Sequence, residues 1–124
     1  MRFASVRVAT GQFDVLVAFY ARLAEVEAAH LAPGFAEIRL AGVTLAISSS
    51  ELIERFNGGA IVPAANRSAM LELEVDDVEA VAARVEALGA EIVQPPTTMP
   101  WANRSMLLRD PDGAIVNIFA RPKA

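Results

Sequence analysis

The chain has 124 residues, 54% of them hydrophobic, with a formal net charge of −4, no cysteine and one histidine. This length suits a single domain spanning residues 1–124, and the high apolar content at low net charge excludes a disordered chain. The missing cysteines exclude disulfide scaffolds, and the acidic balance argues against nucleic-acid binding. No uncharged run reaches the ~20 residues of a membrane-spanning helix, so we expect a cytoplasmic protein with no membrane partner.

The first half of the chain predicts a strand, a helix and two further strands. Residues 3–9 alternate between apolar and polar as a strand does, and residues 35–40 and 43–47 form two short β-type runs. A weaker strand pattern lies near residues 27–31. The buried stripe of the predicted helix recurs at helical spacing and comprises Leu16, Phe19, Tyr20 and Leu23.

The same order of patterns appears again after a short helix at residues 50–56, capped by Ser50, and a linker at about 57–67. Residues 70–75 alternate as a strand, and Asp76–Asp77 supply N-cap chemistry for a second helix. The apolar stripe of that helix comprises Val78, Val81, Ala82, Val85 and Leu88.

The second half continues beyond this helix with a short strand, a loop and a hairpin. Gly89 ends the helix, and residues 92–93 are predicted as a short strand followed by a proline-rich loop at 94–103. Residues 105–109 and 114–119 form the hairpin, closed by the turn Asp110-Pro111-Asp112-Gly113. The sequence thus predicts an α+β fold of two βαβββ modules, at about 1–56 and 68–121.

Alternation within each predicted strand separates two faces of the sheet, because successive side chains point to opposite sides. One face is uniformly apolar and includes Leu45 and Ile47, so we expect the two amphipathic helices to cover it. The other face mixes apolar residues with Ser and Thr and carries the polar residues Arg7, Glu37, Arg39, Glu72, Glu74 and Asn117. Such a mixture suits a small-molecule site. The alternative is a set of exposed ion pairs, which contribute only ~0–1 kcal/mol each.

Three segments carry a resemblance to a known superfamily. Residues 73–78 (Leu-Glu-Val-Asp-Asp-Val), residues 109–113 (Arg-Asp-Pro-Asp-Gly) and the pair Phe19–Tyr20 are similar, in this order, to the glyoxalase, bleomycin-resistance and extradiol-dioxygenase superfamily, also called vicinal oxygen chelate proteins. The resemblance covers essentially the whole chain. It implies one U-shaped mixed sheet around a pocket, helices on the outer face, and a homodimer.

The resemblance also implies where a divalent metal would be bound. Superfamily enzymes hold it near the start of the first strand and on the last strand of each module, which corresponds here to Phe3, Ala46, Met70 and Asn117. None of these is an ordinary ligand of a divalent metal. His30 lies outside all four positions, and we expect it on the surface. We therefore expect no metal and no cofactor.

Trp101 lies in the loop before the final hairpin, where it either forms the mouth of a binding groove, as the resemblance to the bleomycin-resistance branch implies, or closes one end of the sheet. We predict a metal-independent small-molecule binding protein, not an enzyme, which sequesters an aromatic or cationic compound. The alternative is a lyase, isomerase or dioxygenase of the same superfamily whose metal is held by Glu72 or Glu74 with Asn117. The predicted ligand-binding residues are Arg7, Glu37, Arg39, Glu72, Trp101 and Asn117.

Overall fold

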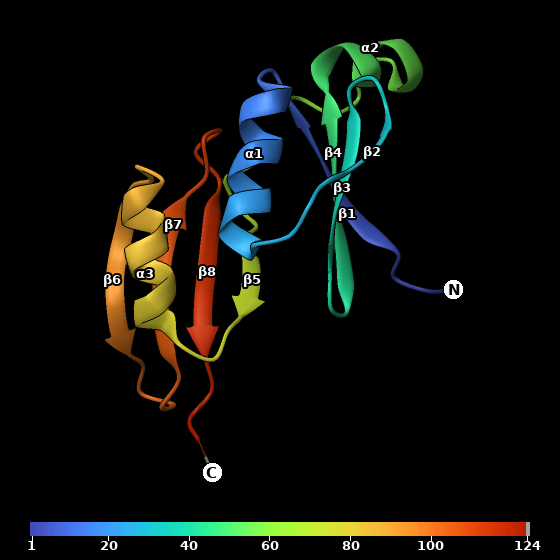
Figure 1. Cartoon of the computed structure of the whole chain (residues 1–124). Helices are drawn as coiled ribbons and strands as arrows, with labels where there is room; N and C mark the ends of the chain where they lie inside the picture. The colour runs from blue at the N-terminus through green and yellow to red at the C-terminus, as the bar shows by residue number, and fades with distance from the viewer. Residues whose placement is uncertain (124) are drawn as a thin grey trace. The chain divides into compact units, whose positions relative to one another are not determined.

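The computed structural model describes residues 1–123, which divide between Ala65 and Asn66 into two units, each built around one sheet (Figure 1). The sheet of the first unit has the strand order β1-β4-β3-β2, with β1 parallel to β4 and the other neighbours antiparallel. Its elements are β1 (Ser5–Thr10), α1 (Phe13–Ala24), β2 (Ala29–Ala32), β3 (Phe35–Leu40), β4 (Val43–Ser49) and α2 (Ser50–Asn57).

The second unit repeats this arrangement with the order β5-β8-β7-β6, in which β5 is parallel to β8. The α+β class and the two βαβββ modules predicted from the sequence are thereby confirmed. The hydrogen-bonded ladders form two separate four-stranded sheets, one in each module. The elements of the second unit are β5 (Leu71–Glu74), α3 (Val78–Ala87), β6 (Ile92–Thr98), β7 (Arg104–Arg109) and β8 (Ile115–Ala120).

The apolar face of each sheet is the face that its helix covers, as the alternation predicted. In the first unit, α1 lies against β3 and β4, where Ile38, Leu45 and Ile47 are almost fully buried. Burying a large aliphatic side chain contributes ~1.5–3 kcal/mol, so this face supplies much of the unit's stability. The buried residues of α1 include the four predicted from the helical spacing, Leu16, Phe19, Tyr20 and Leu23, together with Val17.

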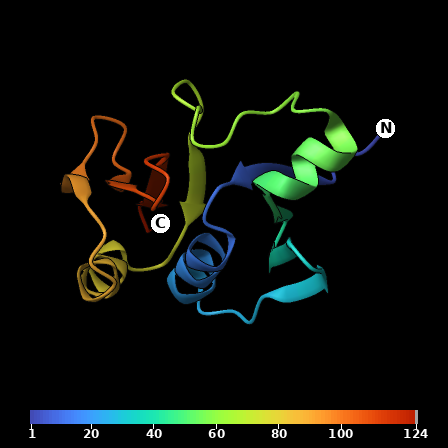
Figure 2. The ribbon, with the colours of Figure 1, turned by 90° about the horizontal axis from the view of Figure 1, so that it is seen from above.

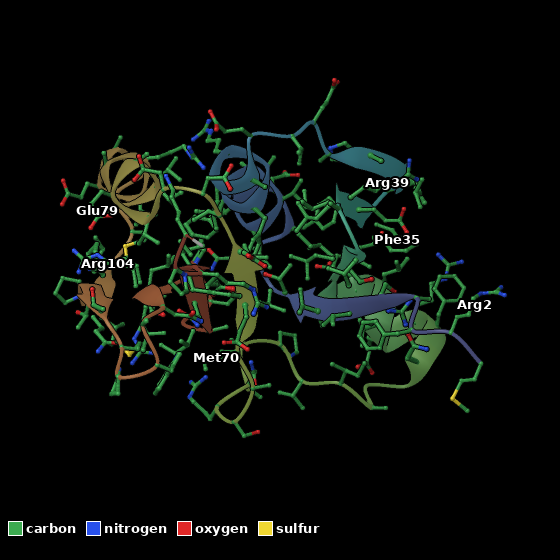
Figure 3. The ribbon with its side chains drawn as sticks, turned by 90° about the horizontal axis from the view of Figure 1, so that it is seen from below. Arg2, Phe35, Arg39, Met70, Glu79 and Arg104 are labelled. Carbon is green, nitrogen blue, oxygen red and sulfur yellow. The ribbon has the colours of Figure 1, made fainter. Side chains whose placement is uncertain are left out.

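Helix α3 begins and ends as its sequence predicted. The carboxylate of Asp77 accepts a hydrogen bond from the backbone N–H of Ala80 at 3.2 Å, and Gly89 adopts a left-handed φ of 73° just beyond the helix. The first turn of α3 is also tied to its sheet, because Arg104 of β7 donates to Glu79 at 2.7 Å (Figure 3). In the final hairpin, Asp110 accepts from the backbone of the closing turn, which confirms its structural role.

Several element boundaries shift by one or two residues from the sequence-based predictions, and three differences matter for the argument. Strand β1 begins at Ser5, so Phe3 lies outside it. The N-cap of α2 is Ser49, whose hydroxyl accepts from the N–H of Leu52 at 3.2 Å; the prediction that Ser50 caps this helix was wrong.

The third difference concerns the segment predicted as a proline-rich loop. Strand β6 runs from Ile92 to Thr98 and includes Pro95 and Pro96. It is the last strand of its sheet and pairs only with β7, with irregular register on both sides of Gln94. Prolines are tolerated there because the outer edge of a sheet needs no N–H donor.

None of the helices within residues 1–123 combines the length and the apolar content that crossing a membrane requires.

Candidate functional site

The face of the second sheet that α3 leaves free carries a row of four side chains, one from each strand. The cross-strand register places Glu72 opposite Asn117, Asn117 opposite Leu107, and Leu107 opposite Gln94. Figure 2 shows α3 on the other side of this sheet. The row therefore brings together two of the predicted site residues, Glu72 and Asn117, with two that were not predicted.

The first two members of this row are hydrogen-bonded to each other. The amide Nδ2 of Asn117 donates to Oε2 of Glu72 at 2.9 Å, joining strands β5 and β8. Asn117 is only 8% exposed, whereas Glu72 is exposed. The carbonyl Oδ1 of Asn117 is buried and has no hydrogen-bond partner in the part of the chain that the structure describes. Turning the amide over would place this oxygen against the carboxylate, so Glu72 fixes the amide orientation.

Apolar side chains surround Asn117 on the remaining sides. Ile115 and Phe119 are its neighbours on the same face of β8, two residues away in each direction, and Leu107 lies across from it. The guanidinium of Arg121 stacks over Phe119 at 5.7 Å and forms an ion pair with Glu74 at 3.2 Å. Glu74 is thus bound to Arg121, and Glu72 is bound to Asn117.

The first unit contributes three of the predicted site residues, but they form a different arrangement. Arg7 and Glu37 flank Ala46 in the register of the first sheet. Glu37 forms an ion pair with Arg39 on the same strand at 2.9 Å, in which Arg39 is exposed and Glu37 is partly buried. Ion pairs that stay open to solvent contribute ~0–1 kcal/mol, so these two residues fit the ion-pair alternative given above.

Helix α2 lies against β1 and β4 on the side of the first sheet opposite to α1 (Figure 2). Its last residue, Asn57, accepts a hydrogen bond from Nη2 of Arg7 at 3.0 Å. The expectation of helices on the apolar face concerned the two amphipathic helices and holds for α1 and α3, whereas the short helix α2 lies on the other face of its sheet. The face that carries Arg7 is partly covered by the unit's own helix, whereas the row containing Asn117 lies on a face without one.

Trp101 lies between β6 and β7 and is 66% exposed. An indole this exposed does not close the end of a sheet, which removes the plug alternative. His30 is also exposed and meets the ring of Phe13 edge-on at 6.2 Å.

The four positions that the resemblance assigns to metal ligands do not fit a divalent cation. The register pairs Val6 with Leu45 and Leu71 with Val116, so superposing the two modules matches Ser5, rather than Phe3, to Met70. A serine hydroxyl and a thioether are poor ligands for the hard or borderline cations these sites hold, and Ala46 offers none. Within residues 1–123, no cluster of three or more His, Asp or Glu side chains could hold a metal ion.

Two polar residues of these faces were not among the predicted site residues. Gln94 was placed at the start of a loop because two prolines follow it closely, although Ile92 and Gln94 alternate with exposed residues as a strand does. Ser48 is fully buried on β4 opposite Phe35, and its hydroxyl has no hydrogen-bond partner among the described residues. Nothing in the sequence distinguishes Ser48 from its serine neighbours.

The repeated βαβββ module is the fold of glyoxalase-like domains. The model of the glyoxalase-like domain family matches residues 5–119, and the chain belongs to this family. The superfamily resemblance noted in the sequence is thereby confirmed. Among curated proteins, none matches the sequence.

Several solved structures share the fold. A glyoxalase/bleomycin resistance protein/dioxygenase from Nocardioides is 27% identical with a TM-score of 0.78, and the match covers 100% of this chain and 85% of that one. A glyoxalase-related enzyme from Fulvimarina pelagi is 21% identical with a TM-score of 0.83, over 98% of this chain and 89% of that one. A family enzyme from Burkholderia phytofirmans PsJN is 17% identical with a TM-score of 0.83, over 96% and 98%.

Proposed function

We propose that the protein is a metal-independent binding protein for a small molecule, of the glyoxalase/bleomycin-resistance type, which sequesters its ligand without chemical turnover. The observation that carries this proposal is the occupant of the last-strand position in the second module. Asn117 stands where a superfamily enzyme would hold its metal, and its amide is already hydrogen-bonded to Glu72 at 2.9 Å. A neutral amide that is already hydrogen-bonded to a carboxylate is a poor metal ligand.

The same face has the composition of a ligand site. Binding sites for small molecules combine apolar contact area with a few polar groups that set orientation. Leu107, Ile115 and Phe119 supply apolar surface beside the polar pair Glu72–Asn117. The exposed indole of Trp101 offers a stacking surface for an aromatic or cationic compound. The cytoplasm remains the expected compartment.

Metal analysis of protein purified without chelator tests this proposal. We expect far less than one equivalent of Zn, Ni, Mn or Fe per chain, and the same low content in the Glu72→Ala variant. Glu74→Ala is measured beside it, because the metalloenzyme alternative allows either carboxylate as a ligand, although Glu74 is paired with Arg121. Near-stoichiometric metal that is lost in either variant would overturn the proposal in favour of the metalloenzyme alternative.

A thermal-shift screen with a library of aromatic, cationic, neutral and anionic compounds tests the binding function itself. A ligand that binds only the folded chain raises its melting temperature by mass action. We expect at least one compound to do so at micromolar concentration. A screen in which no compound raises the melting temperature would contradict the proposal and favour a protein-interaction module.

We also propose that two chains pair as a homodimer. Several large apolar side chains are more than half exposed, and an interface between two chains would remove such side chains from water. They include Phe3, Leu31, Phe56, Val62 and Trp101. Light scattering at micromolar concentration should give a mass of about twice the 13.2 kDa of one chain, and a monomer mass would contradict the pairing.

A further inference from the structure

The buried carbonyl Oδ1 of Asn117 is a hydrogen-bond acceptor with no donor. Asn117 is 8% exposed, and no described residue donates to this oxygen. Leaving a buried polar atom without a hydrogen-bond partner costs free energy, so such atoms are normally paired. The amide cannot relieve the cost by turning over, because Nδ2 is held by Glu72 at 2.9 Å. This oxygen therefore lacks a donor. Because it has almost no exposed surface, a bound molecule reaches it only when one of its partly exposed neighbours, Leu107, Ile115 or Phe119, changes rotamer.

The negative charge of Glu72, beside the Asn117 oxygen, favours some hydrogen-bond donors of a ligand over others. Hydroxyl, amide N–H and ammonium groups can all donate to a carbonyl oxygen. Glu72 places a carboxylate next to Asn117, within hydrogen-bond distance of its amide. A charged donor is favoured there, since hydrogen bonds that involve ionised groups are roughly twice as strong as neutral ones. An anionic ligand would meet repulsion from the same carboxylate.

The surroundings of the acceptor describe the rest of the ligand. The side chains nearest to Asn117 on this face, apart from Glu72, are apolar: Leu107, Ile115 and Phe119. Apolar neighbours favour a ligand whose charged nitrogen is attached to an aromatic or aliphatic body, because the body gains contact area while the nitrogen reaches the polar pair.

We infer that this face of the second sheet is a subsite for a protonated primary or secondary amine on an apolar body, with N–H donating to Oδ1 of Asn117 and Glu72 balancing its charge. The inference rests on the proposed function and makes it narrower. It requires an N–H donor, so a quaternary ammonium of the same charge is a poor ligand.

The equivalent position in the first unit lacks these features. Ala46 takes the place of Asn117 and has no acceptor, and its neighbour on β1 is the cation Arg7. Helix α2 lies on that face, with Asn57 bound to Arg7. The amine subsite is therefore specific to the second module.

Four probes that share a phenyl ring test the inference: benzylamine, benzyltrimethylammonium, benzyl alcohol and benzoate. Titration of the ¹⁵N-labelled protein at neutral pH is expected to shift the side-chain amide resonance of Asn117 with benzylamine. We expect benzyltrimethylammonium and benzyl alcohol to bind at least tenfold more weakly, and benzoate more weakly still. Equal binding of all four probes, or no benzylamine binding at millimolar concentration, would overturn the inference.

Substitutions at Asn117 and Glu72 test whether these two residues cause the preference for benzylamine. Asn117→Leu keeps the approximate volume and removes the acceptor, so we expect about a tenfold loss of benzylamine affinity. Glu72→Gln changes an exposed side chain, so we expect this variant to fold normally. It provides the test if circular dichroism shows that Asn117→Leu is poorly folded. Glu72→Gln is expected to lower the affinity for benzylamine and to leave the affinity for benzyl alcohol unchanged. Glu74→Gln is the matched control and is expected to leave benzylamine affinity unchanged. Unchanged benzylamine affinity in Glu72→Gln would overturn the inference.

The outcomes also separate this inference from the proposed function. A thermal-shift screen that returns only neutral or anionic ligands, with no response of Asn117 to benzylamine, overturns the amine subsite and leaves the binding function standing. Benzylamine that binds with the expected selectivity to a protein carrying near-stoichiometric metal supports the subsite and removes the metal-independent function.

Discussion

Replacing Leu108 with alanine is expected to lower the free energy of unfolding by about 2–5 kcal/mol. Leu108 has no exposed surface, and the register of β7 places it between Val116 of β8 and Ile92 of β6 on the face covered by α3. The loss combines the transfer free energy of the removed carbons with the cavity that the surrounding strands cannot fill. Urea denaturation followed by circular dichroism measures it as a lower midpoint.

Leu107→Ala is the matched control for this effect. The same residue type occurs one position earlier on the same strand, but Leu107 lies on the opposite face, beside Asn117, and is only partly buried. We expect Leu107→Ala to lower the free energy of unfolding by less than about half as much as Leu108→Ala does, because Leu107 buries less area and its removal leaves no closed cavity. Equal losses in the two variants would contradict the assignment of faces on which the candidate site depends.

The division of each sheet into two faces could be predicted from the sequence because alternation is a local property. Leu45 and Ile47 were predicted on the apolar face, and both are buried. The polar residues Glu72 and Asn117 were predicted on the opposite face, and they lie side by side there. Their hydrogen bond could not be predicted, since it depends on the register between two strands far apart in the chain.

The errors arise where position in the sheet, rather than composition, decides the structure. Pro95 and Pro96 argue against a strand unless the strand lies at the edge of its sheet, and only the strand order places β6 there. The choice between Ser49 and Ser50 as the cap of α2 depends on backbone angles, because both residues have the same hydroxyl. Ser49 is extended, with φ −66° and ψ 153°, as an N-cap residue must be.

The placement of α2 explains why the two modules differ although their sequence patterns match. Nothing in residues 50–57 indicates which side of the first sheet the helix covers. The hydrogen bond from Arg7 to Asn57 requires α2 on the side opposite to α1. The sequence pattern repeats, but α2 occupies this face in the first module, whereas no helix of the second unit covers the corresponding face of β5 and β8.

Gly34→Ala is expected to destabilise the chain by about 2–3 kcal/mol and to loosen the start of α2. Gly34 has a left-handed φ of 76°, and a Cβ built there would lie 2.5 Å from Oγ and 3.2 Å from Cβ of Ser49. That hydroxyl is the cap of α2, and the N–H of Ser49 donates to the carbonyl of Gly34 at 2.8 Å. The substitution therefore combines backbone strain with displacement of the cap.

Gly42→Ala separates these two contributions. Gly42 has a similar φ of 88°, but a Cβ there has no neighbour within 4 Å, so only the backbone cost of ~1–2 kcal/mol applies. Urea denaturation should place Gly42→Ala between the wild type and Gly34→Ala. Hydrogen exchange at the N–H of Leu52 should accelerate more in Gly34→Ala, since that N–H is the one bonded to the Ser49 hydroxyl. Equal effects of the two substitutions on Leu52 would mean that the contact with Ser49 does not hold α2 in place.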